Sequence, residues 1–296
     1  DGTECSNLIL ICNEIFGASN FVANVSWQRT YSPRNDSKGI VSEVEHLVVF
    51  SKNPGWQPNK LPRTEAMDSR YKNPDNDVAP WKSSDAFAPG AATHQGMVYA
   101  IQHPFTGEML YPSNGRCWRY QQSSMLEYMQ GWCNYRLENL HDEKERARVC
   151  GIDESAVRKD VLAIVLEEPL EVSAAKAQKV YNRGRWPGFY FTKGGYGGIA
   201  RKTYLENVGG RLPTNLWMYE ETGHTDEAKK ELISLFGGRS PFDTPKPTRL
   251  LDFVLKVAGT SETLMLDSFA GSGTTAHAVL NANKADNGNR HFILIE

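Results

Sequence analysis

Hydrophobic side chains recur along this chain at two spacings, which separate the expected helices from the expected strands. Near the start, five of them follow the spacing of a helix: Leu8, Ile11, Cys12, Ile15 and Phe16. Gly17 is a natural end for that helix. A second set recurs at every other residue, as in a half-buried strand: Phe21, Ala23, Val25 and Trp27. Residues 46–51 give a second strand, so the pattern predicts a helix followed by two strands.

The last part of the chain carries further helical and strand patterns. Residues 226–236 have a helical pattern, for which Thr225 is the expected cap and Asp226 and Glu227 are favourable first-turn residues. A second helix is expected to open at Pro247 and Thr248. An apolar strand follows over 263–266, a helix over 274–280 and a strand over 291–296. The strand at 263–266 therefore runs through a short turn into a helix.

The middle of the chain lacks such regularity. From residue 53 the composition shifts to proline, tryptophan and turn residues, and periodicity fades until about residue 125. A charged helical stretch is expected around 139–149. We place domain boundaries on this basis at 1–52, 53–215 and 216–296.

The turn after the strand at 263–266 is a candidate cofactor site. Asp267 stands where the strand ends, and Gly271 and Gly273 permit positive φ and close backbone approach before the helix begins. GSGTTA also fits a dinucleotide fingerprint, with Glu296 as its ribose-binding carboxylate. A carboxylate before the turn would repel a pyrophosphate and attract the ammonium of S-adenosylmethionine, so Asp267 favours the second cofactor. A glycine turn without a ligand is the third alternative.

Lys246 stands at the start of the helix that Pro247 and Thr248 open. A helix N-terminus already favours anions, so a lysine there suggests a carboxylate or phosphate partner. The alternative is a solvated lysine between two turn prolines.

A second candidate surface is basic and aromatic. No acidic residue occurs between Glu171 and Glu206. The basic residues of this segment are Lys176, Lys179, Arg183, Arg185, Lys193, Arg201 and Lys202. They alternate with Tyr181, Trp186, Phe189, Tyr190, Phe191, Tyr196 and Tyr204. Basic side chains can neutralise phosphates and aromatic ones can stack on bases, which predicts a nucleic-acid surface; the alternative is a solvated hairpin with its aromatic residues in the core.

Composition narrows the class of protein. The net charge of −2 does not indicate a nucleic-acid binder, so such a surface would have to come from local segregation of charge. The five cysteines form no C-x-x-C pair, which argues against a disulfide framework or a structural zinc site and for a reducing compartment, the cytoplasm. The longest apolar run, residues 161–166, is too short to span a membrane. His224 and His277 have no catalytic partner pattern and are expected to be structural.

Several motifs in order along the chain resemble one known family. They are NEIFGASNFVANVSW, YSPRNDSKG, EHLVVFSK, YKNPDND, ETGHTDEAKKEL, FDTPKPTRLL and the FAGSGTT turn. The last two resemble the beta group of DNA amino-methyltransferases, and the whole series resembles the modification subunit of type III restriction-modification systems. The family usually continues NPDND with a Pro-Arg-Gly turn, where this chain has Val78, Ala79 and Pro80.

The resemblance implies a fold and a set of cofactor residues. The fold would be α/β, a partial Rossmann-like S-adenosylmethionine-dependent methyltransferase sheet with an inserted mixed α+β target-recognition region. Residues expected around the methionine and adenosine parts are Asp267, Phe269, Gly271 and Gly273. Thr244 and Lys246 would hold the methionine carboxylate, and Glu296 would accept hydrogen bonds from the ribose.

The resemblance also implies an activity and partners. The reaction would be methyl transfer to adenine N6 in double-stranded DNA; cytosine N4 stays open, because the cofactor motifs are shared. A restriction subunit with nuclease and helicase functions and a second modification subunit would be the protein partners. In the polar loop at 31–39 and next to it, Arg29, Arg34, Asn35 and Lys38 would contact phosphates, although a solvated loop is an alternative. Arg183, Arg185 and Lys193 complete the expected DNA-binding set.

One expected motif is absent from the sequence. Family members carry a [DNS]-P-P-[YFW] tetrapeptide that accepts hydrogen bonds from the poorly nucleophilic amine of a flipped base. No such tetrapeptide occurs in the 296 residues, and the chain begins with Asp1. We therefore expect an internal slice of a longer enzyme, without catalytic residues of its own and inactive alone. A non-catalytic DNA-binding module and a dehydrogenase are the alternatives.

Overall fold

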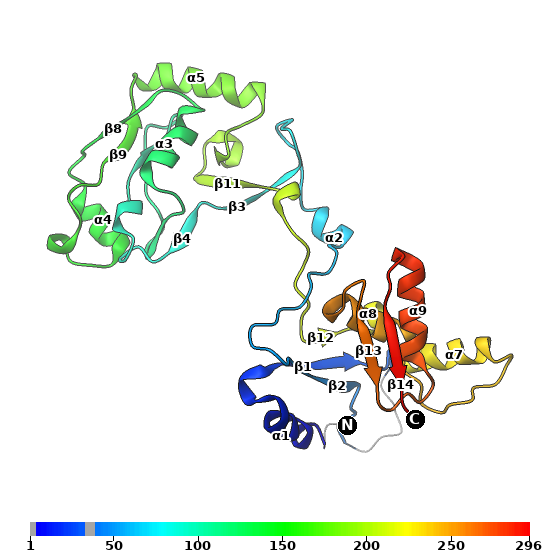
Figure 1. Cartoon of the computed structure of the whole chain (residues 1–296). Helices are drawn as coiled ribbons and strands as arrows, with labels where there is room; N and C mark the ends of the chain where they lie inside the picture. The colour runs from blue at the N-terminus through cyan, green and yellow to red at the C-terminus, as the bar shows by residue number, and fades with distance from the viewer. Residues whose placement is uncertain (1–3, 33–38) are drawn as a thin grey trace. The chain divides into compact units, whose positions relative to one another are not determined.

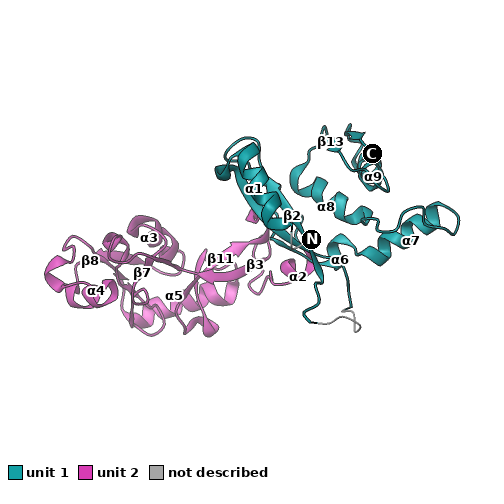
Figure 2. Cartoon of the chain, turned by 90° about the horizontal axis from the view of Figure 1, so that it is seen from below, with its two compact units in different colours: residues 1–63, 210–296 teal, residues 64–209 magenta. Residues whose placement is uncertain are grey.

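The structure is a computed structural model that describes residues 4–32 and 39–296. It divides into two compact units, the first made of residues 1–63 and 210–296 and the second of residues 64–209 (Figure 2). Composition had placed the boundaries after residues 52 and 215. Each unit contains small sheets and helices, so the fold is mixed α/β.

The first unit begins with the helix and hairpin that the hydrophobic pattern predicts. Helix α1 (Cys5–Phe16) ends at Gly17, whose φ is +88° and whose N–H donates to the Asn13 carbonyl. A 3₁₀ turn, η1 (Ala18–Asn20), leads into β1 (Phe21–Gln28). Strand β2 (Val44–Phe50) pairs antiparallel with β1, and the short β12 (Leu216–Trp217) pairs parallel with its other edge.

The second half of this unit contains the strand, turn and helix of the candidate cofactor site. Strands β13 (Leu264–Asp267) and β14 (His291–Leu294) pair in parallel and lie side by side in Figure 1. Parallel neighbours need a crossover connection, which α9 (Thr274–Asp286) provides. The predicted elements at 263–266, 274–280 and 291–296 are thus confirmed.

Helix α8 (Thr248–Ala258) connects two small cores of this unit. On one side, Leu250 and Phe253 pack with Trp27 of β1 and Trp217 of β12. On another side, Leu255 packs against Ala278 and Val279 of α9. The β1 sheet and helix α9 are therefore both packed against α8.

Two short helices precede α8, and one expected cap is wrong. They are α6 (Tyr219–Thr222) and α7 (Thr225–Leu235). The predicted cap Thr225 lies inside α7, where its hydroxyl donates to the Arg29 carbonyl. His224 caps the helix instead, because its Nδ1 accepts the Glu227 N–H at 3.3 Å.

The second unit is built from short strands around an aromatic core. One sheet has the order β10 (Phe189–Phe191), β11 (Ile199–Tyr204), β3 (Trp81–Asp85), and β4 (Phe87–Pro89) pairs with β7 (Arg116–Trp118). A four-stranded sheet has the order β6 (Met109–Leu110), β5 (Ile101–Gln102), β9 (Ala163–Leu166), β8 (Tyr135–Glu138). Trp118, Trp132, Phe189 and Phe191 are fully buried members of the core.

The helices of this unit are α2 (Glu65–Asp68), α3 (Gln122–Gln130), α4 (Glu143–Cys150) and α5 (Leu170–Arg183). Four 3₁₀ turns complete it: η2 (Gln95–Met97), η3 (Glu154–Ala156), η4 (Lys193–Gly195) and η5 (Leu205–Asn207). The charged helix expected around 139–149 is shorter than predicted, since α4 begins at Glu143. In the described ranges, none of the helices is both long and apolar enough to span a membrane.

Candidate functional site

Asp267, at the end of β13, is fixed by two hydrogen bonds from the residues that follow it. One carboxylate oxygen accepts the Phe269 N–H at 3.1 Å, and the other accepts the Thr275 hydroxyl at 2.6 Å. Thr275 is buried in the first turn of α9, so it ties the carboxylate to the start of that helix. The acid is therefore held at the junction of strand, turn and helix.

The glycine turn has the left-handed backbone that its sequence predicts. Gly271 has φ +50° and Gly273 has φ +72°, and Gly273 directly precedes α9. The Gly271 N–H donates to the Glu296 carboxylate at 2.7 Å, so this acid lies against the turn. Phe269 is 91% exposed, which leaves its ring available to a ligand.

The two expected cofactor segments are neighbours in the structure. The Thr274 hydroxyl, at the start of α9, donates to the Lys246 carbonyl at 3.1 Å. A Cβ placed on Gly271 would come within 3.0 Å of the Phe242 ring. Residues 242–246 thus lie directly against residues 271–274, as a shared site requires.

The Lys246 side chain is half exposed and has a partner that the sequence did not suggest. Its ammonium lies 2.5 Å from the Glu45 carboxylate of β2 and 5.5 Å from the centre of the Trp27 ring. An ammonium has three donors, so this pair leaves Lys246 able to bind a second carboxylate. Thr244, two residues earlier, is exposed.

A polar cluster joins α7, α8 and α9 beside this site. The Glu231 carboxylate accepts the backbone N–H of Thr248 at 3.2 Å and its hydroxyl at 2.9 Å, which caps α8 from a neighbouring helix. His277 Nδ1 lies 3.2 Å from the same hydroxyl, in keeping with the structural role expected for it. Nearby on α8, burial raises the pKa of Asp252, although Lys256 and His277 oppose the shift. Periodicity gave no signal for this cluster.

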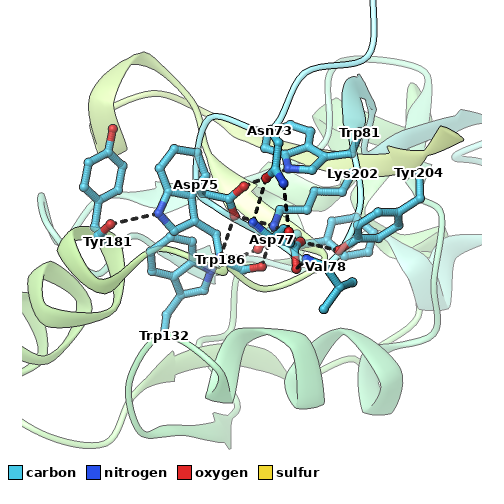
Figure 3. Close-up of polar contacts among 11 residues, drawn as sticks. Asn73, Asp75, Asp77, Val78, Trp81, Trp132, Tyr181, Trp186, Lys202 and Tyr204 are labelled. Carbon is cyan, nitrogen blue, oxygen red and sulfur yellow. Dashed lines mark hydrogen bonds and ion pairs between the residues drawn. The ribbon is translucent and has the colours of Figure 1, made fainter. Parts of the chain in front are cut away.

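The basic and aromatic segment of the second unit contains one lysine that cannot contact a phosphate. Lys202 is fully buried, with its ammonium 2.5 Å from the Asp75 carboxylate and 2.8 Å from the Trp186 carbonyl (Figure 3). The Asp77 carboxylate is its second acid partner and also accepts the Tyr204 hydroxyl at 2.6 Å. Burial opposes ionisation of Asp77, but hydrogen bonds from Lys202 and Tyr204 outweigh it and lower its pKa.

Several aromatic residues of this segment are also internal. Phe189, Tyr190 and Phe191 form strand β10, and all three are buried in the core. Their expected contact with bases is therefore wrong. Tyr196 is 63% exposed and remains available. The mixture of outcomes means that part of the segment is core and part is surface.

The three basic residues singled out in this segment all lie at the surface. Arg183 is exposed at the end of α5, Arg185 is exposed just after it, and Lys193 is exposed at the start of η4. Within the residues that the structure describes, none of the three forms an ion pair. Arg29, at the end of β1, lies 3.5 Å from the Glu45 carboxylate and is 42% exposed. Arg34, Asn35 and Lys38 lie outside the described residues.

Comparison with known proteins identifies the class to which this fold and these motifs belong. A family model for N6/N4 DNA methylases matches residues 1–296. The chain therefore belongs to the N6/N4 DNA methylase family.

Individual relatives are similar over almost the whole chain. The Mod subunit of the type III restriction-modification enzyme StyLTI from Salmonella typhimurium is 29% identical over 99% of this chain and 36% of its own length. The type II methyltransferase M.KpnI from Klebsiella pneumoniae is 25% identical over 100% of this chain and 60% of its own. The Mod subunit of the type III enzyme EcoPI from Escherichia phage P1 is 24% identical over 100% of this chain and 41% of its own length. The chain thus spans between about a third and three fifths of these relatives.

Proposed function

We propose that this chain is the cofactor-binding and target-recognition part of a DNA methyltransferase that uses S-adenosylmethionine. The observation that carries the proposal is the direct contact between the two cofactor segments, through Thr274 and Lys246 and through Gly271 and Phe242, in a chain of the N6/N4 DNA methylase family. In this account the fold is a partial Rossmann-like methyltransferase sheet. Residues 64–209 form the inserted target-recognition region.

The chemistry of the turn fits this cofactor. Asp267 supplies a carboxylate for the cofactor's ammonium, and Lys246, with Thr244, supplies donors for its methionine carboxylate. Gly273 has no side chain, and a Cβ placed there would meet no atom within 4 Å. The space beside its backbone is therefore open to a ligand. The exposed Phe269 ring would cover the adenosine, and Glu296 would accept hydrogen bonds from the ribose.

The same residues argue against a dinucleotide. A pyrophosphate at the turn would lie near the carboxylates of Asp267 and Glu296, and these negative charges would repel it. Glu296 already accepts the Gly271 N–H, a donor that a phosphate would need.

The bound cofactor would supply a methyl group on a sulfonium. The residues of this chain hold and orient that donor, and fixed geometry is a large part of catalysis in such transfers. The acceptor amine needs hydrogen-bond acceptors of the [DNS]-P-P-[YFW] type, and the 296 residues contain no such tetrapeptide. We propose that the chain alone is inactive for this reason.

The relatives suggest the substrate and the partners. Two of those described above are Mod subunits of type III restriction-modification enzymes. By analogy, the substrate is double-stranded DNA in the cytoplasm, the modified atom is adenine N6, and the partners are a restriction subunit and a second Mod chain. Arg183, Arg185 and Lys193 would contact phosphates, and Arg29 would do so together with Arg34 and Lys38.

Methyl transfer by the full-length protein tests this proposal. The protein is incubated with duplex DNA and S-adenosylmethionine labelled in its methyl group, and the DNA is then digested to nucleosides. We expect the label in N6-methyl-2′-deoxyadenosine. Label in N4-methyl-2′-deoxycytidine would move the proposal to the cytosine class, and DNA binding without any transfer would favour a non-catalytic module.

A further inference from the structure

The surface turn that carries Arg183 and Arg185 is attached to the buried ion pair of the second unit. The Asp75 carbonyl accepts the Arg185 N–H at 2.7 Å. Its carboxylate accepts the next N–H, that of Trp186, also at 2.7 Å. One acidic residue therefore bonds two successive backbone N–H groups of the turn.

The turn has a backbone conformation that needs such support. Gly184 has φ +79°, and a Cβ at this position would come within 2.3 Å of the Asp75 carbonyl oxygen. Arg185 has φ +52°, which a residue with a side chain rarely adopts. Strained conformations of this kind persist where the surroundings over-determine them and are frequent at binding sites.

Asp75 is itself fixed from the interior. Its other carboxylate oxygen accepts the Trp81 indole N–H at 2.8 Å, and its side chain, like that of Lys202, is fully buried (Figure 3). Lys202 also donates to the Trp186 carbonyl, so both the N–H and the C=O of Trp186 are held. Arg183 and Arg185 are exposed, and the backbone of Arg185 and Trp186 is thus anchored to the core through Asp75.

The loop that carries Lys193 contacts the same aromatic residues as the turn of Arg183 and Arg185. Tyr181 stacks on Trp186 with ring centres 4.7 Å apart and an angle of 19° between the rings. On η4, a Cβ placed on Gly195 would lie 3.7 Å from the Tyr181 ring. The loop that carries Lys193 and the turn that carries Arg185 therefore pack on the same tyrosine–tryptophan pair.

We propose that Asp75 is a positioning residue for DNA, because its carbonyl and carboxylate hold the turn of Arg183, Gly184 and Arg185 so that both guanidinium groups are presented to phosphates. This inference rests on the proposed DNA-binding function. It assigns to the NPDND motif a role in binding: the motif's first aspartate fixes the turn. Phosphate contacts set register, and a fixed turn loses less conformational entropy on binding.

The matched test compares Asp75→Asn with Asp77→Asn in the full-length protein. Each change removes one carboxylate from Lys202, but only Asp75 bonds the turn. DNA affinity is measured by fluorescence anisotropy over a range of salt, with thermal unfolding as the control for folding. We expect Asp75→Asn to weaken binding about tenfold or more and to lower the salt slope by about two, since each lost phosphate contact removes about 0.9. Asp77→Asn should lower the unfolding midpoint by a similar amount and leave the slope unchanged.

A second variant keeps the test valid where Asp75→Asn does not fold. Gly184→Ala leaves every charge of the ion pair in place and forces the turn away from the Asp75 carbonyl. We expect it to reduce affinity and salt slope as Asp75→Asn does. Retention of the wild-type slope in this variant overturns the inference.

Replacement of both arginines supplies the reference for these effects. Arg183→Ala with Arg185→Ala should lower the slope by about two, and adding Asp75→Asn to this pair should change it no further. If the pair has no effect, the proposed DNA surface and the inference both fail. If the pair has an effect but Asp75→Asn and Gly184→Ala have none, or if Asp77→Asn reproduces them, the inference alone fails.

Discussion

At the scale of single residues, the candidate cofactor site contains two charged side chains. One is held by residues close to it in sequence, and the other is held by a residue far away in the chain. Asp267 is bonded by Phe269 and Thr275, both close to it in sequence. Lys246 is paired with Glu45, which lies 201 residues away. The first arrangement is local and the second comes from the tertiary fold.

Lys246→Ala should separate a role in cofactor binding from a role in stability. A hydrogen bond to a charged group contributes about 1.5–3 kcal/mol, so we expect S-adenosylmethionine to bind about 10- to 100-fold more weakly. Its pair with Glu45 is partly exposed, so the free energy of unfolding should fall by at most about 1 kcal/mol. Calorimetric titration measures the affinity.

Lys256→Ala is the control for that change. Lys256 is an exposed lysine at the other end of α8, so its removal alters the net charge equally without touching the site. Equal affinities of the two variants would contradict the role of Lys246.

Asp252→Asn should change the pH dependence of stability. Burial raises the pKa of Asp252 in the folded state, so the folded protein binds its proton more tightly and loses stability as pH rises above the ordinary value of 3.8. The asparagine variant should be more stable at pH 7, by less than about 1 kcal/mol because solvent screens the group, and the difference should vanish below about pH 4. Thermal unfolding at the two pH values measures this; a less stable variant at pH 7 would show that attraction to Lys256 and His277 dominates.

The sequence predicted the local structure around some candidate site residues, because the signal for that structure is local. Asp267, Gly271 and Gly273 belong to a short strand–turn–helix pattern, and the structure has that pattern. The sequence could not show that Lys202 is buried, since its acid partners lie about 125 residues away in the chain. The same limit applies to Glu45, whose partner Lys246 is brought to it only by folding.

At the scale of elements, the predictions were best for helices and strands with long regular patterns. The helix expected to open at Pro247 and Thr248 forms as α8, with Leu250 and Phe253 in one core and Leu255 in another. Helix α1 also forms as predicted, but its Ile11 and Ile15 are 53% and 67% exposed, so periodicity gave the helix and not its burial. Most strands of the second unit have only two to four residues, which is too short to produce a clear periodic signal.

The glycine turn before α9 offers an element-scale prediction with an internal control. Gly271→Ala and Gly273→Ala both introduce a side chain at positive φ, which costs about 1–2 kcal/mol. Only the first also pushes against Phe242, so we expect Gly271→Ala to lower the unfolding midpoint more. Gly273 faces open space, and its alanine variant should lose cofactor affinity at a smaller loss of stability.

Thermal unfolding and cofactor titration of the same samples measure both effects. A Gly273→Ala protein that keeps wild-type affinity would show that the cofactor does not approach this part of the turn. A Gly271→Ala protein as stable as Gly273→Ala would contradict the importance of the Phe242 contact.

At the scale of the whole molecule, the candidate cofactor site lies within one compact unit, whereas the expected phosphate contacts come from both units. The candidate cofactor residues all belong to the unit made of residues 1–63 and 210–296, whereas Arg183, Arg185 and Lys193 belong to residues 64–209. Each unit has its own hydrophobic cores. The net charge of −2 hides this division, because the basic turn is a local feature of one unit.

Binding of S-adenosylmethionine to the full-length protein tests the central claim most directly. The measurement is a calorimetric titration with S-adenosylmethionine, repeated in the presence of excess NAD and with the Asp267→Asn variant. We predict saturable binding that NAD does not displace and that Asp267→Asn weakens at least about tenfold, since the ammonium loses its charged partner. Preferential binding of NAD, or full affinity in Asp267→Asn, would contradict the assignment of this turn to S-adenosylmethionine.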